Sequence, residues 1–290
     1  MTSLHERSSD DLTTAAPSRT GFAPAAEDSF RALGQAARRL VRERSFGTYG
    51  RRLVTGHGRL GWCPVCERGV VFVALSDWLR DTYQCMRCGS IPRQRALMQV
   101  LDAVAPRWRR LRIHESSPDG PGSQRIARDC DGYDASQYWP DVAPGASRDG
   151  VRCEDVTRLT FEDASLDLFI TQDVFEHVFD AGRGFAEIAR VLRPGGLHVF
   201  TVPWYWWKPT LIRARTGDDG LEHLEPPDYH ANPVDASGSL VVTEWGWELP
   251  ELIHGESGMT TTVHAITDPR RGIVGAFREV MVSRRVSGPG

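Results

Sequence analysis

The sequence predicts an α/β protein with a mostly parallel sheet, preceded by a small zinc-binding module. Three observations predict this. An amphipathic run, FAEIARVL (Phe185 to Leu192), is followed within four residues by an apolar run, LHVFTVP. A second apolar run, LDLFIT (Leu166 to Thr171), is unbroken at its centre, as expected of a strand buried on both faces. Ahead of both, four cysteines stand in two C-x-x-C pairs.

The tetrapeptide RPGG, Arg193 to Gly196, separates the first two runs. The apolar residues of FAEIARVL are spaced so that they form one face of a helix. Pro194 cannot continue that helix, and Gly195 or Gly196 can take the left-handed conformation that ends it. We therefore expect a helix that stops at RPGG and leads directly into a buried strand, which is half of a parallel α/β unit.

Length and composition limit the architecture. A chain of 290 residues, 40% of them hydrophobic, can form one large α/β domain with an accessory module. Its formal net charge of -3 gives no overall attraction to nucleic acid. It has no membrane-length apolar run and no secretory pattern, so we expect a cytoplasmic protein without membrane contact. Residues 1–28, rich in Ser, Thr, Ala, Pro and Asp, are expected to be a disordered tail, and residues 29–60 a helical lead-in.

The cysteine pairs CPVC and CMRC are separated by eighteen residues, a spacing typical of a tetrahedral zinc site built from two knuckles. The four expected ligands are Cys63, Cys66, Cys85 and Cys88. A redox pair would occur once, and disulfides are not expected in the cytoplasm. Since four thiolates fill the coordination sphere, we expect a structural zinc in a module over residues 61–90. Cys130 and Cys153 are isolated and are expected to be small core residues.

Residues 91–290 alternate between helical and strand patterns. The first strand, LRIHE, ends at Glu115, and the loop after it carries Gly120, so backbone N–H groups there can approach a nucleotide-like ligand. The segment GYDASQ is expected to place Asp134 at the end of a second strand, where its carboxylate can accept hydrogen bonds from ribose hydroxyls. A third strand, in VRCEDVTRLTF, is expected to end in Asp155.

These segments resemble the class I S-adenosylmethionine-dependent methyltransferases, most closely the type 11 methyltransferase-domain group. The matching stretches are EDVTRLTF, LDLFITQDVFEHV and the helix, RPGG and strand described above, within about residues 90–285. The resemblance implies a Rossmann-like sheet that binds S-adenosylmethionine, with RPGG as a fold-building turn. A closing antiparallel hairpin is expected from MTTTVHAITDP and AFREVMVSRRV.

The resemblance also implies roles for single residues. Glu115 is expected near the methionine amino group, Asp134 at the ribose and Asp155 at the adenine amino group. Gln172 and Asp173 are expected to border the sulfonium and the acceptor. The residues expected to bind the cofactor are Glu115, Ser117, Gly120, Asp134, Ser136, Asp155, Val156 and Gln172. The chain departs from the family in its first motif, where Ser116, Ser117 and Pro118 stand in place of glycines.

Three residues are candidates for the chemistry itself: His177, Asp173 and His230. Methyl transfer from a sulfonium needs mainly alignment and a dry pocket, and it needs a base only for a weakly acidic acceptor. His177 is the nearest candidate base in the sequence, because histidine titrates near neutral pH. The alternative is that His177 packs a helix against the sheet.

An insertion, residues 204–258, lies between the fifth strand and the closing hairpin and begins with four consecutive aromatic residues, WYWW. Loops that leave the carboxyl ends of parallel strands cover the ligand crevice, so this segment is expected to be an acceptor lid whose aromatic residues partly line the pocket.

The function expected first is methylation of a small or medium-sized metabolite at oxygen, nitrogen or carbon. An RNA methyltransferase is the alternative, because cysteine-rich modules also precede this fold in ribosomal-RNA guanine methyltransferases and because Arg38 to Arg52 include several arginines that can meet phosphates. A non-catalytic S-adenosylmethionine-binding protein is the third. The sequence gives no signal for an oligomeric state.

Overall fold

The computed structural model describes residues 49–286, except residues 53, 219 and 232–236. The predicted tail, residues 1–28, lies outside the described residues, as does most of the predicted lead-in, residues 29–60. Residues 49–52 are helical, but the first strand, β1, begins at Gly58. The cysteine module therefore starts before residue 61, where the sequence had placed its boundary.

An eight-stranded sheet forms the centre of the molecule in the order β17-β18-β9-β8-β4-β5-β7-β6. Its strands are β4 (Ile113–Ser116), β5 (Tyr133–Gln137), β6 (Ser147–Arg148), β7 (Val151–Cys153), β8 (Leu166–Gln172), β9 (Leu192–Thr201), β17 (Thr260–His264) and β18 (Val280–Arg284). The pairings from β9 to β7 are parallel, whereas β18 is antiparallel to both β9 and β17. The predicted mostly parallel sheet with an antiparallel closing pair is confirmed.

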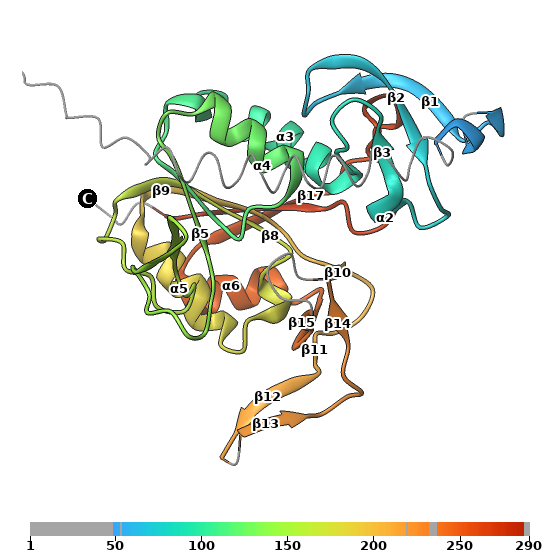
Figure 1. Cartoon of the computed structure of the whole chain (residues 1–290). Helices are drawn as coiled ribbons and strands as arrows, with labels where there is room; N and C mark the ends of the chain where they lie inside the picture. Colours follow the sequence, from blue (N-terminus) through green and yellow to red (C-terminus); the bar gives the residue numbers. More distant parts are fainter. Residues whose placement is uncertain (1–48, 53, 219, 232–236, 287–290) are drawn as a thin grey trace, which may run out of the picture.

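Helices cover both faces of this sheet (Figure 1). On one face lie α3 (Pro92–Val104) and α4 (Gly120–Asp129), and on the other lie α5 (Ala181–Val191) and α6 (Leu249–Ser257). Each face has its own apolar cluster: Leu97 and Ile126 belong to the first, and Phe185 and Ile253 to the second. Among the described residues, no helix is long and apolar enough to cross a bilayer.

RPGG behaves differently from the prediction. Helix α5 ends at Val191, and β9 begins at Leu192, so the tetrapeptide lies inside the strand. Leu192 pairs with Leu166 and Leu197 with Leu168, which leaves the residues between them as a bulge. Gly195 does take the left-handed conformation, with φ 81°, but it turns the bulge rather than ending the helix. In the bulge, the Gly195 N–H donates to the carbonyl of Arg285, which ties the bulge to the end of the neighbouring strand β18.

The cysteine module is a three-stranded antiparallel sheet, and a short helix is inserted before its last strand. Its elements are β1 (Gly58–Cys63), β2 (Arg68–Ala74), α2 (Leu79–Thr82) and β3 (Tyr83–Cys85). Phe72 and Tyr83 belong to the same apolar cluster as Leu97 of α3, so module and sheet share one core. The module also packs on the connection between β17 and β18: a Cβ on Gly272 there would lie 2.9 Å from the Phe72 ring.

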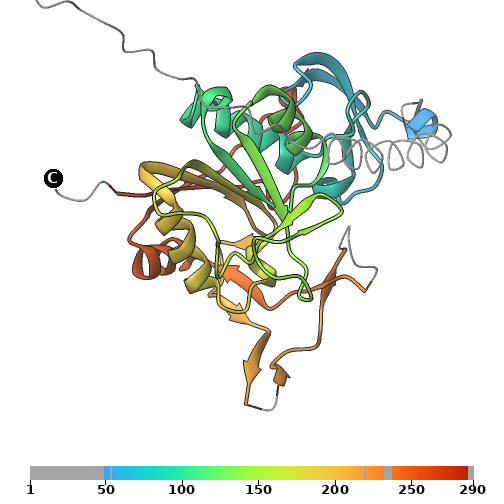
Figure 2. The same ribbon diagram turned by 60° about the vertical axis from the view of Figure 1, so that its left-hand side comes forward.

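The predicted lid consists of short strands that lie below the module at the same end of the sheet (Figure 1). They are β10 (Trp204–Tyr205), β11 (Leu211–Ile212), β12 (Ala214–Gly217), β13 (Gly220–His223), β14 (Tyr229–His230), β15 (Ser239–Leu240) and β16 (Thr243–Gly246). The hairpin β12–β13 extends away from the body in two views (Figures 1 and 2). The last part of the predicted lid is instead α6, a core helix that buries Leu249 and Ile253. The lid proper therefore ends near residue 248.

Candidate active site at the carboxyl ends of the parallel strands

The backbone register brings four strand ends to one level. The N–H of Ser117 donates to the carbonyl of Ser136 (2.8 Å), and the N–H of Glu154 to that of Gln137 (3.2 Å). On the other side of β4, Ser116 pairs with Thr171 of β8. Gln137 pairs with Cys153 of β7, so Cys153, Gln137, Ser117 and Gln172 form one row across β7, β5, β4 and β8. In a parallel α/β sheet, this edge is where ligands bind.

The loop after β4 keeps a glycine-like backbone although it lacks the first glycines of the family motif. Ser117 has φ 54°, in the left-handed region that favours glycine. Gly120 has φ 75°, and a Cβ there would lie 2.2 Å from Nε2 of Gln94. Gly120 is already the first residue of α4, so the loop is shorter than the sequence suggested. The N-terminus of α4 thus faces the row of strand ends.

Glu115 does not face this edge as a free carboxylate. It is fully buried, and its oxygens accept hydrogen bonds from Ser123 (2.8 Å), Tyr133 (2.7 Å) and Gln172 (2.8 Å). Burial raises the pKa of Glu115, an effect that these donors oppose. All three donors are protein groups, so Glu115 fixes the positions of β5, α4 and Gln172.

The expected position of Asp134 is wrong. Asp134 is the second residue of β5, opposite His114, and its Oδ2 lies 3.5 Å from His114 Nδ1. Ser136 is also turned inward, because its hydroxyl is buried 2.9 Å from Nε2 of His114. The side chain at the carboxyl end of β5 is Gln137, which the sequence analysis missed. Continuing β5 in the sequence by one residue beyond Ser136, to the level of Ser117 after β4, would have identified Gln137.

Asp155 and Val156 follow β7 at the same edge of the sheet. One Asp155 oxygen, Oδ1, accepts bonds from the Thr157 N–H (2.9 Å) and hydroxyl (2.7 Å), which form an Asx turn. Val156 is buried. The turn holds the Asp155 carboxylate and the Val156 backbone in a fixed arrangement beside β7.

Gln172 supplies an acceptor without a partner. Its Nε2 donates to Glu115, but its Oε1 is buried and has no hydrogen-bond partner among the described residues. A buried amide oxygen is costly to leave unpaired. An ammonium group is a suitable donor, and S-adenosylmethionine carries one, so this part of the row fits the expected cofactor.

Asp173 is held by two arginines that the sequence analysis did not single out. Arg80 of α2 forms a hydrogen-bonded ion pair with its Oδ2, Arg93 Nε of α3 lies 3.1 Å from the same oxygen, and the Thr201 hydroxyl donates to Oδ1 (3.0 Å). Burial raises the pKa of Asp173, but the Arg93 and Arg80 guanidiniums outweigh burial and lower it to about 2. Asp173 is therefore a charged anchor between the module and β8, and it is poorly suited to accept a proton.

His177 and His230 lie together beside Glu176, which the sequence analysis did not consider. The His177 and His230 rings meet edge to face, with centroids 5.1 Å apart. His177 Nδ1 lies 2.8 Å from the Leu240 carbonyl of β15, so this nitrogen carries the proton and donates to the lid. The nearby Glu176 carboxylate raises the pKa of His230. His177 thus packs against the lid and not between a helix and the sheet.

The four aromatic residues at the start of the lid divide into two groups. Trp204 and Tyr205 are half-buried, and Trp204 donates to the Gly246 carbonyl (2.7 Å), whereas Trp206 and Trp207 are 60% and 59% exposed. These three tryptophans and Phe277 line an open groove of about 200 Å³. Phe277 also lies beneath the Arg80 guanidinium, 5.9 Å from its ring centroid, so the groove adjoins the Asp173 anchor.

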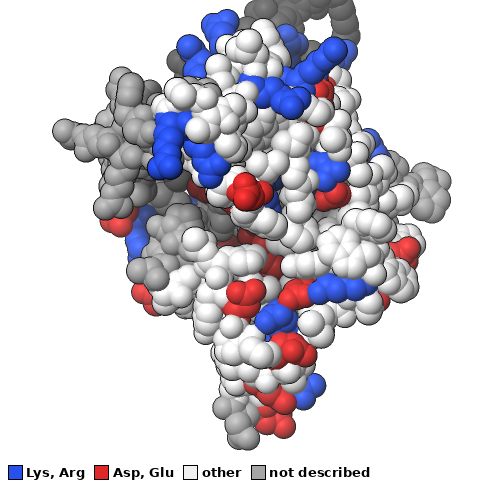
Figure 3. All heavy atoms as spheres, turned by 90° about the vertical axis from the view of Figure 1, so that its right-hand side faces the viewer, with Lys and Arg blue, Asp and Glu red and all other residues white. Residues whose placement is uncertain are grey.

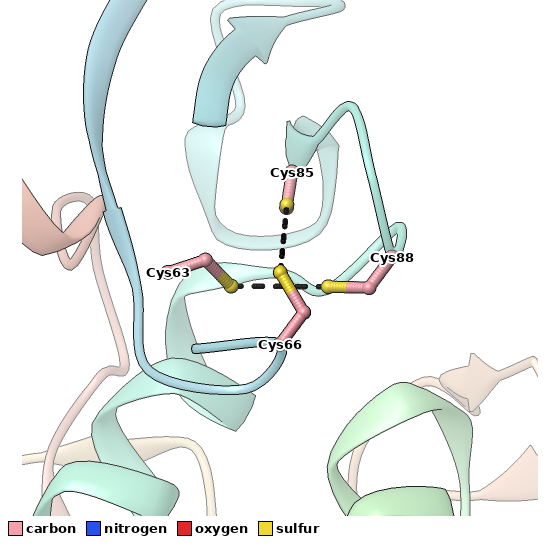
Figure 4. A group of neighbouring side chains, drawn as sticks. All are labelled: Cys63, Cys66, Cys85 and Cys88. Atoms are coloured by element: carbon pink, nitrogen blue, oxygen red, sulfur yellow. Dashed lines mark hydrogen bonds between the residues drawn. The ribbon is translucent and has the colours of Figure 1, made fainter. Parts of the chain in front are cut away.

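The four cysteines of the module converge on one point (Figure 4). The Sγ atoms of Cys63 and Cys88 are 3.8 Å apart, and those of Cys66 and Cys85 are 4.0 Å apart. All four sulfurs lie within 4.8 Å of one another. In each knuckle the residue after the second cysteine is left-handed and donates its N–H to the carbonyl of the first cysteine: Glu67 to Cys63 and Gly89 to Cys85. None of the four cysteines forms a disulfide within the described residues.

Comparison with known proteins gives one family match. Residues 120–200 match the family model described as a methyltransferase domain. A search of curated proteins finds no match.

Solved structures that are similar to the chain include an S-adenosylmethionine-dependent methyltransferase from Mesorhizobium loti, with 18% identity, 66% of this chain and 98% of the other covered, and a TM-score of 0.45. A second similar structure is a chain of the complex between the Haloferax volcanii Trm112 methyltransferase activator and a methyltransferase. It has 16% identity and a TM-score of 0.44, and the match covers 68% of this chain and 92% of the other. The 1,6-didemethyltoxoflavin-N1-methyltransferase of Burkholderia thailandensis has 17% identity and a TM-score of 0.41, and the match covers 94% of this chain and 95% of the other. At these levels of similarity, none of the three indicates the acceptor.

Proposed function

We propose that this S-adenosylmethionine-dependent methyltransferase transfers a methyl group to a small or medium-sized acceptor bound between the cysteine module and the lid. The proposal rests on one observation: residues of the lid and of the cysteine module both contact the residues that follow β8. The lid carbonyl of Leu240 binds His177, the lid residue His230 lies beside Glu176, and Arg80 of the module binds Asp173. A strand end covered from both sides suits a compact acceptor better than a polynucleotide.

The row of strand ends supplies the groups for the cofactor. In this proposal, Gln137 takes the ribose position that the sequence assigned to Asp134, and Asp155 with the Val156 backbone takes the adenine position. Gln172 Oε1 accepts from the methionine ammonium. S-adenosylmethionine supplies the methyl group on a sulfonium, so the protein needs mainly to align the acceptor and exclude water.

His177 acts in alignment rather than as a general base. Its Nδ1 is bound to the lid carbonyl of Leu240, and its Nε2 faces the Glu176 carboxylate at 3.9 Å. Nδ1 is therefore occupied, and Nε2 faces a buried carboxylate, while His177 does not line the aromatic groove to which we assign the acceptor. We assign acceptor contacts to the exposed aromatic residues of the groove, Trp206 and Trp207, which offer flat apolar surfaces beside the anchor.

An RNA acceptor finds less support on the surface. Figure 3 looks onto the end of the molecule where module and lid meet: basic side chains predominate over the upper part of the described surface, and acidic and basic side chains are mixed over the lower part. The two arginines nearest the row, Arg80 and Arg93, are already paired with Asp173. RNA phosphates are bound by Lys and Arg side chains that have no other partner, and these two arginines are not available for that contact.

The acceptor class can be tested directly. The full chain is incubated with S-adenosylmethionine and either a low-molecular-mass metabolite extract or purified total RNA, and S-adenosylhomocysteine is measured. The expected result is turnover with the metabolite extract that persists after nuclease treatment. Turnover only with RNA, falling steeply with added salt, would replace the proposal with the RNA alternative. Binding of S-adenosylmethionine with no turnover in either sample would favour a non-catalytic binding protein.

The cysteine module holds a structural zinc in this proposal. A tetrahedral zinc with Zn–S bonds of about 2.3 Å keeps its sulfurs roughly 3.8 Å apart. Two of the six Sγ separations, 3.8 Å and 4.0 Å, fit this value, and all six are within 4.8 Å. Four thiolates leave no position for water or substrate. The module's contribution to the reaction is therefore positional, through Arg80 on Asp173.

A further inference from the structure

A buried carboxylate without a hydrogen-bond partner lies close to the end of β8. The Glu176 side chain is 1% exposed, and neither of its oxygens has a hydrogen-bond donor within the described structure. Every other buried carboxylate near the row has donors: Glu115 has three protein donors and Asp173 has two arginines and a threonine. Burying a carboxylate is unfavourable unless a positive charge or donors compensate it. A cation bound beside Glu176 would compensate its buried charge.

Two imidazoles lie beside this carboxylate at distances that a metal ion can bridge. Oε1 of Glu176 is 3.7 Å from His230 Nδ1 and 3.9 Å from His177 Nε2. The ligand atoms of all three residues lie within 4.8 Å of one another. These separations are too long for hydrogen bonds. A four-coordinate ion with bonds of about 2.1 Å to nitrogen and oxygen keeps its ligand atoms roughly 3.4 Å apart, so a small inward movement would complete the site.

The hydrogen bond of His177 to the lid prepares it as a ligand. Because Nδ1 donates to the Leu240 carbonyl, Nε2 carries the lone pair, and it is the nitrogen that faces Glu176. A metal-bound histidine commonly donates its other ring N–H to a carbonyl in this way. A cavity of about 20 Å³ is lined by two of the three residues, Glu176 and His230, among others. This volume holds about one water molecule, which is a suitable further ligand.

We propose that Glu176, His177 and His230 bind a divalent transition metal ion, separate from the four-cysteine site. Two imidazoles and one carboxylate are a ligand set that suits Zn²⁺ or Fe²⁺ and leaves open coordination positions. His230 comes from lid strand β14 (Tyr229–His230), whereas Glu176 and His177 follow β8 in the short helix η2 (Phe175–His177). The ion thus ties the lid to the end of β8, so metal binding and closing of the lid are coupled.

The test uses Zn²⁺ alone, without cofactor or acceptor. The full chain is first loaded with one equivalent of Zn²⁺, and a second equivalent is followed by calorimetry. We expect the wild type to bind the second ion and Glu176→Gln and His230→Ala to bind it roughly a hundredfold more weakly. The matched control is His223→Ala, which removes another lid histidine that is exposed on β13 and belongs to neither cluster of possible metal ligands among the described residues. It is expected to bind like the wild type.

Cobalt distinguishes the two sites. Co²⁺ bound by four thiolates absorbs strongly through sulfur-to-metal charge transfer, whereas Co²⁺ bound by two imidazoles and a carboxylate gives only weak bands. The second equivalent of Co²⁺ should add weak bands that Glu176→Gln removes while the thiolate absorption stays. Glu176→Gln changes one atom, so it keeps the test valid if His230→Ala folds poorly.

Two results would overturn the proposal: no second ion bound by the wild type, or a second ion bound equally well by both variants. The first would mean that Glu176 is compensated by a protonated histidine alone. Because the measurement involves neither S-adenosylmethionine nor an acceptor, its failure leaves the proposed methyl transfer untouched, and failure of methyl transfer leaves the metal site untouched.

Discussion

At the scale of single residues, Asp173 combines a left-handed backbone, φ 51°, with a buried ion pair to two arginines. The sequence placed it correctly after the fourth strand but suggested a catalytic role. Its partners come from α2 and α3, more than 75 residues earlier in the chain, so no local pattern pointed to them. A long-range ion pair of this kind is visible only once the fold is known.

The pKa of Asp173 leads to a prediction about acid stability. Its folded-state pKa, about 2, lies below the ordinary 3.8, so the ion pair stabilises the fold above pH 3.8, and this contribution is lost as the pH falls through about 2. The shift corresponds to about 2 kcal/mol. Asp173→Asn should lower the free energy of unfolding in urea by at least this amount at neutral pH, with a smaller difference from the wild type at low pH.

The matched control for Asp173→Asn is Asp163→Asn, which breaks an exposed pair with Arg190. Surface pairs contribute little, so this variant should change stability by less than about 1 kcal/mol. Equal stability of wild type and Asp173→Asn at neutral pH would show that the anchor is not formed.

His177 allows a second prediction at this scale. Asparagine can also donate to the Leu240 carbonyl, so His177→Asn keeps that contact to the lid and removes only the ring nitrogen at Nε2. If His177 aligns and does not accept protons, the pH profile of kcat should keep its shape in this variant, even if turnover falls. Loss of the limb that reports histidine ionisation, with a drop of about a hundredfold or more, would instead identify a general base.

At the scale of elements, apolar sequence patterns predicted the helices and strands correctly where the element is buried in the core. LDLFIT became β8, with one further residue, and FAEIARVL lies within α5 and the first residue of β9. The position of Asp134 was wrong because β5 extends to Gln137, and strand length depends on pairing with β4 and β7. RPGG was assigned to a turn because the sequence cannot show that Leu192 already pairs with Leu166.

The cysteine module is the element whose role can be tested by a single substitution. Cys85→Ser should lose most of the zinc and melt at a lower temperature, because the strand β3 and the helix α2 that carries Arg80 are held by that knuckle. Metal analysis and thermal unfolding are the measurements. Cys153→Ser, at a buried cysteine outside the module, is the control and should retain its zinc. A full zinc content in Cys85→Ser would contradict the four-thiolate site.

At the scale of the whole molecule, module and lid meet over the same end of the sheet. The sequence predicted both segments and the mostly parallel sheet between them, because cysteine spacing and apolar runs are local signals. It did not predict that the module shares a core with α3, nor that Arg80 and Arg93 reach β8. Those contacts join segments that are distant in the chain, and they make the module part of the candidate active site.

The central claim is that S-adenosylmethionine binds across the row of strand ends, and calorimetry of the cofactor with the full chain tests it most directly. Wild type should bind, and Gln137→Ala should bind more weakly by about 1 kcal/mol, because one hydrogen bond to the cofactor is lost. Asp134→Ala alters the same strand, but Asp134 lies opposite His114 and before the row of strand ends, so this variant should bind like the wild type. Absence of binding by the wild type, or weakening by Asp134→Ala and not by Gln137→Ala, would contradict the account.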